Sequence, residues 1–124
     1  MKFASVRLVT HDIDRLIAFY TRLTGQQANR LAPEFAEFRA DGFALAISSE
    51  ALIARFNAGA AVAAANRSAM LEFAVEDVDA VLAELGEDGL DIAMPPTDMP
   101  WGNRSMLLRD PDGNVVNIFA RKAG

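Results

Sequence analysis

Hydrophobic positions follow an extended pattern and then a helical pattern, and this order occurs twice along the chain. Residues 3–9 are predicted to be extended, and a helical pattern begins after Asp12, a good N-cap, and ends at Gly25. Residues 70–75 and the helix after Asp77 repeat this order, with Gly86 or Gly89 as the stop. The expected buried stripes of the two helices are Ile13, Leu16, Ile17, Tyr20 and Leu23, and Val78, Val81, Leu82 and Leu85.

Each block ends in a pattern typical of a β-hairpin. Residues 105–109 and 115–119 are apolar arms around Asp110–Asn114, where proline fixes φ, aspartate bonds its own backbone and glycine accepts a positive φ. Asp41-Gly42 is the corresponding turn of the first block. We therefore predict a β-α-β-β-β order for each block, with a further short helix possible at 51–56.

The two repeats of strand, helix and hairpin are related by two different sequence offsets. Asp12 recurs as Asp77, 65 residues later, whereas the turn at Asp41 recurs at Asp112, 71 residues later. The second block therefore has six more residues between helix and hairpin, and we expect them in a loop at Pro95–Pro100. The pattern predicts an α+β protein with one module at 1–58, a connector at 59–66 and a second module at 67–124.

The motifs of the chain resemble those of the vicinal oxygen chelate superfamily, which includes glyoxalase I, extradiol dioxygenases and bleomycin-resistance proteins. The resemblance rests on Pro100-Trp101-Gly102, on Arg109–Asn114 with its flanking strands, and on the strand–helix unit at Val9–Gly25. It implies that the two βαβββ modules form a half-open barrel with a cleft.

The resemblance also implies four positions for metal ligands, one on the first and one on the last strand of each module. The offsets place them at Ser5 and Met70, and at Ala46 and Asn117. Alanine has no donor atom, the methionine thioether is soft, and an asparagine amide is a weak ligand. We therefore expect these four residues to share one cleft and to bind no metal, and we expect no cofactor.

The composition of the chain limits the kinds of molecule that it is expected to bind. The net charge of −5 and the sequence pI near 4.7 argue against nucleic acid and would suit a cationic small molecule, although an acidic balance also simply aids solubility. The sequence has no cysteine, so it has no disulfide, thiolate metal site or cysteine nucleophile. No apolar run is long enough for a membrane span, and we see no signal peptide, so we expect a cytoplasmic protein.

Other residues have two interpretations each. His11, the only histidine, is either a general base beside Asp12 or a surface residue before a helix cap, and we favour the second. Trp101 either lines a ligand groove, as the resemblance to bleomycin-resistance proteins implies, or plugs the barrel mouth. We assign no catalytic residue.

Apolar and charged residues are candidates for the lining and rim of the cleft, although phenylalanine and methionine are more often core residues. The candidate lining residues are Phe35, Phe38, Phe56, Met70, Met99 and Met106. The candidate charged residues are Glu34, Glu37, Glu72, Asp98, Arg39 and Arg104.

Two functions remain open. The first is a metal-free protein that binds an aromatic, cationic or antibiotic-like small molecule in a groove formed by a homodimer. The alternative is an enzyme of the same superfamily, such as a lyase, an isomerase or a dioxygenase-like protein, acting on a small metabolite. Metal content of the purified protein discriminates between them.

Overall fold

The computed structural model describes residues 1–40 and 42–122, so Asp41 of the predicted first turn lies outside the described residues. The chain divides into two compact units, Met1–Ala65 and Asn66–Gly124. Each unit has the predicted β-α-β-β-β order, and the α+β fold of two βαβββ modules is confirmed.

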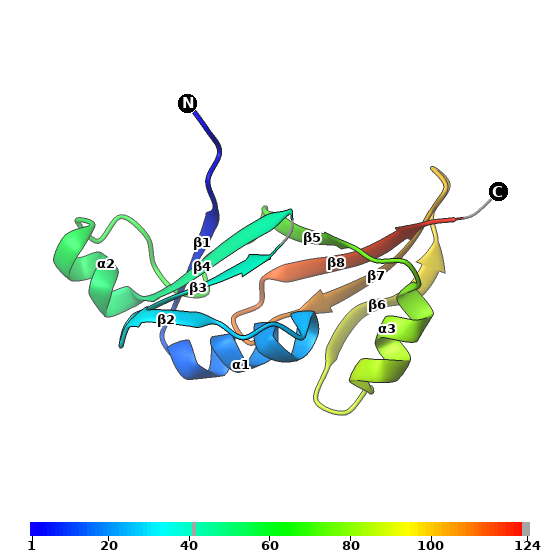
Figure 1. Ribbon diagram of the computed structural model, residues 1–124, viewed down its shortest axis with the longest axis horizontal. Helices are drawn as coiled ribbons and strands as arrows, with labels where there is room; N and C mark the ends of the chain where they lie inside the picture. The colour runs from blue at the N-terminus through cyan, green and yellow to red at the C-terminus, as the bar shows by residue number, and fades with distance from the viewer. Residues whose placement is uncertain (41, 123–124) are drawn as a thin grey trace. The chain divides into compact units, whose positions relative to one another are not determined.

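The first unit is a mixed sheet with a helix along one face (Figure 1). Its order is β1-β4-β3-β2, with β1 parallel to β4 and the other neighbours antiparallel. The strands are β1 (Val6–Thr10), β2 (Asn29–Ala32), β3 (Phe35–Ala40) and β4 (Phe43–Ser49). β1 is shorter than the predicted strand at 3–9. It begins at Val6, and residues 3–5 lie outside it, with Phe3 84% exposed.

Helix α1 (Ile13–Thr24) begins and ends where the sequence predicts. The Asp12 side chain accepts a hydrogen bond from the Arg15 backbone N–H at 3.1 Å, and Gly25 ends the helix at φ +70°. Leu16 and Tyr20 are fully buried, and the Tyr20 ring meets the Phe38 ring edge-on. The helix therefore covers the sheet face that contains Phe38.

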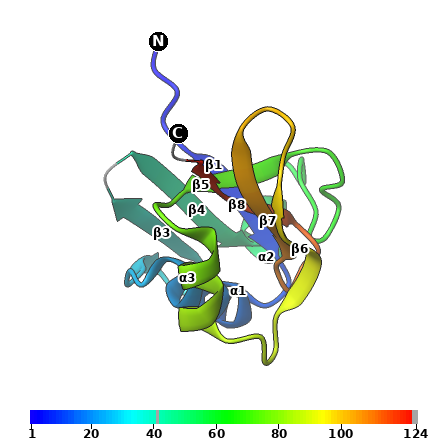
Figure 2. The same ribbon diagram turned by 90° about the vertical axis from the view of Figure 1, so that its right-hand side faces the viewer.

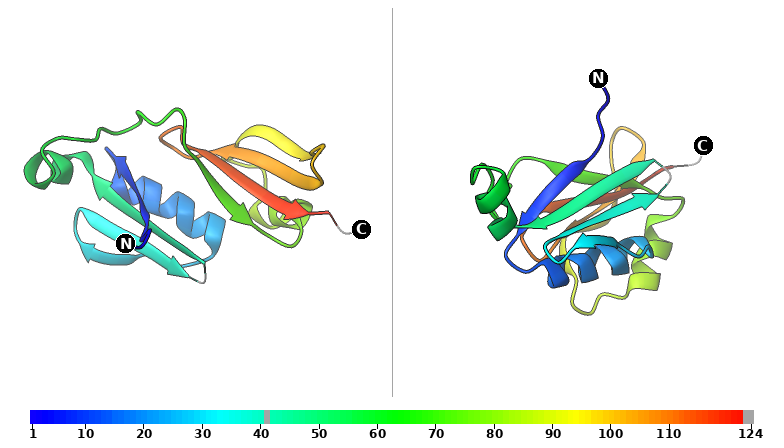
Figure 3. Two further views of the ribbon diagram at one scale, coloured as in Figure 1. Left: turned by 90° about the horizontal axis from the view of Figure 1, so that it is seen from above. Right: turned by 60° about the vertical axis from the view of Figure 1, so that its left-hand side comes forward.

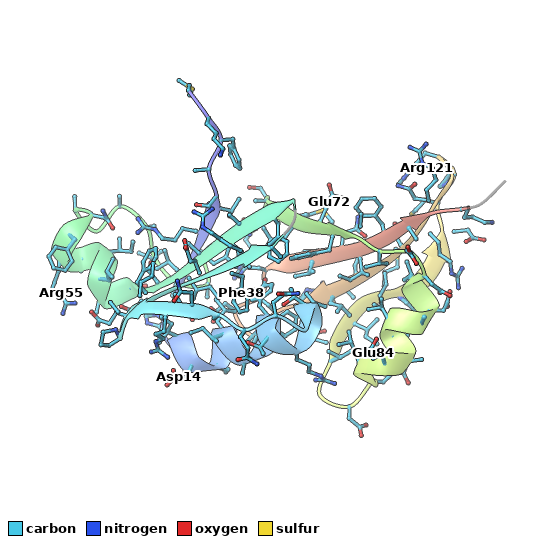
Figure 4. All side chains as sticks on the ribbon, viewed as in Figure 1. Asp14, Phe38, Arg55, Glu72, Glu84 and Arg121 are labelled. Atoms are coloured by element: carbon cyan, nitrogen blue, oxygen red, sulfur yellow. The ribbon has the colours of Figure 1, made fainter. Side chains whose placement is uncertain are left out.

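The possible helix at 51–56 is present as α2 (Glu50–Phe56). The Ser49 hydroxyl caps it by accepting a hydrogen bond from the Leu52 backbone N–H at 3.1 Å. Ile53 is buried, and the helix packs near β4 and β1. α2 therefore closes the end of the first unit, and Arg55 marks its outer surface in Figure 4.

The second unit repeats the first, with sheet order β5-β8-β7-β6. Its strands are β5 (Met70–Ala74), β6 (Asp91–Asp98), β7 (Asn103–Arg109) and β8 (Val115–Arg121), and its helix is α3 (Val78–Leu85). Figure 3 shows β5 and β8 side by side, and they pair in parallel. Asp77 caps α3 and Gly86 ends it, as predicted.

The strand registers confirm both repeat offsets. Arg7 lies opposite Ala46 in the first unit. Adding 65 to Arg7 and 71 to Ala46 gives Glu72 and Asn117, which lie opposite each other in the second unit. The two modules therefore correspond residue by residue at their parallel strand pairs.

The extra residues of the second block do not form the loop expected at Pro95–Pro100. β6 continues through Pro95 and Pro96 to Asp98, and it has eight residues where β2 has four. β6 is an edge strand whose pairing with β7 shifts register between Met94 and Thr97. Proline is tolerated there because an edge strand leaves backbone N–H groups unpaired in any case.

The turn between β7 and β8 is built around one buried carboxylate. Asp110 Oδ1 accepts hydrogen bonds from the backbone N–H groups of Asp112 and Asn114, both at 2.9 Å, and Oδ2 accepts one from Asn114 Nδ2 at 2.8 Å. Gly113 has φ +83°, as the turn requires. Asn66 donates from Nδ2 to Asn114 Oδ1 at 3.0 Å, which attaches the start of the unit to this turn.

Candidate functional site

The sheet of the second unit has one closed and one open face. α3 packs against β7 and β8, and the buried apolar residues of these strands are Met106, Leu108, Val116, Ile118 and Ala120. Side chains alternate along a strand, so the residues between them project from the opposite face. That face contains partly exposed Leu107, Asn117 and Phe119, together with Met70 and Glu72 of β5.

Glu72 and Asn117 form a polar pair in the middle of this open face. They are direct neighbours across β5 and β8, and Asn117 Nδ2 donates a hydrogen bond to Glu72 Oε2 at 2.8 Å. The Asn117 Oδ1 atom is buried and has no hydrogen-bond partner. The open face therefore holds an exposed carboxylate beside an unsatisfied acceptor.

The equivalent pair of the first unit has different chemistry. Arg7 stands where the repeat has Glu72, and its Nη2 donates to Asn57 Oδ1 at 3.1 Å. The Arg7 guanidinium also lies 5.8 Å from the centroid of the Phe35 ring. Ala46 stands where the repeat has Asn117, so this pair offers no carboxylate.

The four positions at which the resemblance places metal ligands do not fit a divalent cation. Ala46 is buried and has no donor atom, and Met70 offers only a thioether. Asn117 offers only its neutral Oδ1, because an amide nitrogen does not ligate a metal and here donates to Glu72. Across residues 1–40 and 42–122, no group of three His, Cys, Asp or Glu side chains could hold a metal ion.

The structure divides these four positions between the units. Exposed Ser5 precedes β1 and buried Ala46 lies on β4, both in the first unit. Met70 is 47% exposed and lies on β5, two residues before Glu72, which is the partner of Asn117. Their sharing of one cleft stays a prediction.

Trp101 lies in the tight turn between β6 and β7. The backbone N–H groups of Met99 and Gly102 bond to the carbonyls of Asn103 and Met99, and Gly102 has φ +98°. The Trp101 side chain is 72% exposed, and Met99 beside it is half-buried. Figure 2 shows this hairpin turn, in orange, standing clear of its sheet. Such exposure leaves the indole available for contact with a ligand or a partner.

Arg104 is held by acidic side chains of its own unit. Its Nε and Nη2 donate to Asp79 at 2.7 and 3.0 Å, and its Nη1 donates to Asp98 at 3.1 Å. The hydrogen bond from Arg104 lowers the pKa of Asp79, and those from Lys122 and Arg104 lower the pKa of Asp98. The bonds of Arg104 to Asp79 and Asp98 raise its own pKa. A ligand carboxylate would have to compete with these pairs.

Three other candidate lining residues differ in their exposure. Phe38 and Met106 are fully buried on the helix-covered faces of their sheets, whereas Phe56 is 73% exposed at the end of α2. Phe38, labelled in Figure 4, contacts Tyr20 rather than an open surface. Phe38 and Met106 are therefore core residues, and only Phe56 of the three is accessible.

His11 borders a shallow groove of the first unit. Its Nε2 lies 3.6 Å from Glu50 Oε2, and the imidazole is exposed. The groove encloses about 480 Å³ and is lined by Thr10, His11, Ile13, Glu34, Ser49, Glu50, Ala51 and Ala54. Glu34 is paired with Arg55, and Glu50 accepts the Ala63 backbone N–H at 2.6 Å. These carboxylates therefore already have partners within the fold.

A second groove lies at the start of the second unit. It encloses about 510 Å³ and is lined by Asn66, Arg67, Ser68, Ala69, Met70, Arg109, Gly113 and Val115. Met70 connects this groove with the open face that carries Glu72. Sequence reasoning missed this groove and the bond between Glu72 and Asn117, although the two offsets already aligned that pair.

Within the residues that the structure describes, no helix is long and apolar enough to cross a membrane.

Comparison with known proteins gives relatives over nearly the whole chain. Protein YraH of Bacillus subtilis strain 168, described as uncharacterized, is 28% identical over 96% of this chain and 98% of its own length. A glyoxalase/bleomycin resistance protein/dioxygenase from Nocardioides is 27% identical, covering 100% of this chain and 86% of that chain with a TM-score of 0.81. A glyoxalase-related enzyme from Fulvimarina pelagi is 23% identical, covering 98% and 89%, also with a TM-score of 0.81.

The family comparison agrees with the topology of both units. The sequence profile described as Glyoxalase/Bleomycin resistance protein/Dioxygenase superfamily matches residues 2–118. The chain therefore belongs to the glyoxalase/bleomycin resistance protein/dioxygenase superfamily.

Proposed function

We propose that this protein binds a small aromatic or cationic molecule, antibiotic-like in character, without using a metal ion. The proposal rests on the side chains at the four positions where the resemblance places metal ligands. Ala46 contributes no donor, Met70 contributes only a soft thioether, and Asn117 contributes only a neutral amide oxygen. A superfamily fold with such residues retains an open surface for a ligand but no basis for chelation.

Trp101 supports an aromatic ligand. Its indole is 72% exposed in a turn fixed by backbone hydrogen bonds, so it offers a flat contact area at low entropic cost. Glu72 and the net charge of −5 favour a ligand of positive charge. The absence of cysteine from the sequence is consistent with a cytoplasmic location, which we also propose.

We further propose that the protein acts as a homodimer. Superfamily proteins of this size complete their clefts by pairing or exchanging modules across a two-fold axis, as the resemblance implies. Two copies of the chain would double the open sheet faces available to a ligand.

A thermal-shift screen tests the binding proposal. A compound that binds only the folded state raises the midpoint of unfolding, and the rise grows with concentration. The screen uses aromatic amines, neutral aromatic compounds and antibiotics in a buffer with EDTA. Trp101→Ala should keep the unfolding midpoint of the free protein and lose most of the shift. If no compound stabilises the protein in EDTA, the proposal is wrong.

The alternative is an enzyme of the same fold, and the specific observation in its favour is Glu72. A carboxylate oriented by an amide and facing an open surface can act as a general base on a small metabolite. Stoichiometric nickel, zinc, manganese or iron in protein purified without chelator would favour a metal-dependent version of this alternative.

A further inference from the structure

The bond between Glu72 and Asn117 joins an exposed carboxylate to an amide whose own acceptor oxygen is buried. Asn117 donates from Nδ2 to Glu72 Oε2, which fixes the amide so that its Oδ1 is the unused atom. The opposite orientation of the amide would place two acceptor oxygens against each other, so the chemistry supports the assigned one. The pair therefore presents a carboxylate and an amide oxygen, both of which accept hydrogen bonds.

The Asn117 Oδ1 atom needs a donor. It is buried without a hydrogen-bond partner, and such an acceptor costs folding free energy until something donates to it. Among the described residues, no ion pair within 4.0 Å includes Glu72. Residues 1–40 and 42–122 therefore supply neither a donor for the amide oxygen nor a cation for the carboxylate.

The surroundings of the pair are apolar. β8 lies between β5 and β7, and Leu107 of β7 is the direct neighbour of Asn117. Met70 and Phe119 project from the same face of the sheet. These side chains are partly or largely exposed, so a ligand of mixed character would gain apolar contact beside the polar pair.

We propose that Glu72 and Asn117 recognise the protonated amine of a ligand whose remainder is hydrocarbon or aromatic. An ammonium group carries the charge that complements Glu72, and it has enough N–H donors to serve the carboxylate and, once it has displaced the atoms that cover it, Asn117 Oδ1. This inference rests on the proposed function, since it names the ligand class of the same protein.

The pair is separate from Trp101. Arg121, which pairs with Asn103 next to the Trp101 turn, lies four residues beyond Asn117 on β8. Four residues of a strand span about 13 Å. Ammonium recognition at Glu72 and stacking on Trp101 can therefore be tested independently.

The experiment compares 2-phenylethylamine, which is protonated at pH 7, with the neutral 2-phenylethanol. Both are titrated into isotope-labelled full-length protein while the side-chain NH₂ signals of Asn117 and the emission of Trp101 are followed. Glu72→Gln removes the charge but keeps an oxygen that accepts the bond from Asn117. Glu84→Gln is the matched control, because Glu84 is exposed on α3, on the other side of the sheet (Figure 4).

We expect saturable shifts of the Asn117 signals with the amine and at least tenfold weaker binding of the neutral alcohol. Glu72→Gln should weaken amine binding at least tenfold and leave alcohol binding unchanged, while Glu84→Gln should change neither. No saturable amine binding by the wild type, or equal binding by Glu72→Gln, would overturn the inference.

Two further outcomes also decide against the inference. Amine binding that alters Trp101 emission but ignores Glu72→Gln would leave the proposed function intact and remove Glu72 from it. Saturable shifts of the Asn117 signals on addition of CaCl₂, MgCl₂ or MnCl₂, reversed by EDTA, would assign the pair to a cation and also contradict metal-free binding.

Discussion

Arg104 on β7 and Asp79 in the first turn of α3 face each other through two hydrogen bonds. Nε donates to Oδ2 at 2.7 Å and Nη2 donates to Oδ1 at 3.0 Å, which is the bidentate geometry of a strong guanidinium–carboxylate pair. Asp98 accepts from the same guanidinium at 3.1 Å and from Lys122 Nζ at 3.0 Å. This network joins α3 to β6, to β7 and to Lys122, which directly follows β8.

The network predicts a pH-dependent effect of Arg104→Gln. The pKa values of Asp79 and Asp98 are lowered in the folded protein, so their contribution to stability is present above their usual pKa and is lost as the pH falls through the lowered values. Arg104→Gln should lower the urea midpoint at pH 7, and the difference from wild type should shrink below about pH 4.

Urea unfolding at pH 7 and at several values below pH 4 checks this prediction. Arg39→Gln is a suitable control, because Arg39 pairs with Glu37 of the same strand, at 3.0 Å, and so joins no two elements there. If Arg104→Gln lowers the urea midpoint as much below pH 4 as at pH 7, the electrostatic account is contradicted.

Phe38 and Phe56 should respond oppositely to truncation. Phe38 is fully buried against Tyr20, so Phe38→Ala should cost about 3–5 kcal/mol of unfolding free energy. Phe56 is 73% exposed, so Phe56→Ala should change stability by no more than about 0.5 kcal/mol. Denaturant unfolding measures both, and Phe38→Leu replaces Phe38→Ala if the latter does not fold. Equal losses would show that the burial of Phe38 is misassigned.

The Asp110 turn should be sensitive to loss of its carboxylate. Asp110→Ala removes the acceptors of three hydrogen bonds and leaves their donors unpaired in a buried turn, which should cost about 2–4 kcal/mol. Asp110→Asn keeps one acceptor oxygen and should lose less. Thermal unfolding of the two variants checks this order. A tolerated Asp110→Ala would mean that the turn is held by the backbone alone.

Helix boundaries were predictable because their causes are local. Asp12 and Asp77 accept hydrogen bonds from Arg15 and Ala80 within their own first turns, and Gly25 adopts a positive φ. These interactions involve neighbouring residues only, so the sequence contains the whole signal. The repeat offsets extended this local information to the pairing of distant strands.

Features that depend on the partners in the sheet were harder to predict. Pro95 and Pro96 suggested a loop, yet they lie in β6, because its position at the sheet edge removes the penalty for proline. Phe35 and Phe38 lie in the same strand, and the sequence does not say which of the two is buried. Phe38 is buried because Tyr20 of α1 packs against it. The hydrogen bond of Asn117 depends on the side chain opposite it, which only the register supplies.

The proposed homodimer predicts a particle of twice the 13.4 kDa chain mass. Light scattering coupled to size-exclusion chromatography at micromolar concentration measures this mass directly. A monomer mass throughout the concentration range would contradict the proposed dimer, and it would require each chain to bind its ligand alone.

A fluorescence titration of Trp101 with a compound from the screen tests the central claim most directly. Trp101 is the only tryptophan of the sequence, so its emission reports on one position. We predict a saturable change in emission with the same dissociation constant in EDTA and in a buffer with Mn²⁺, Ni²⁺ or Zn²⁺. Trp101→Ala removes both the apolar area that the indole buries and a stacking energy of about 0.5–1.5 kcal/mol, so calorimetry should show this variant binding the compound tenfold more weakly or worse. Binding that occurs only with the divalent cation, or that leaves the emission unchanged, would contradict the account.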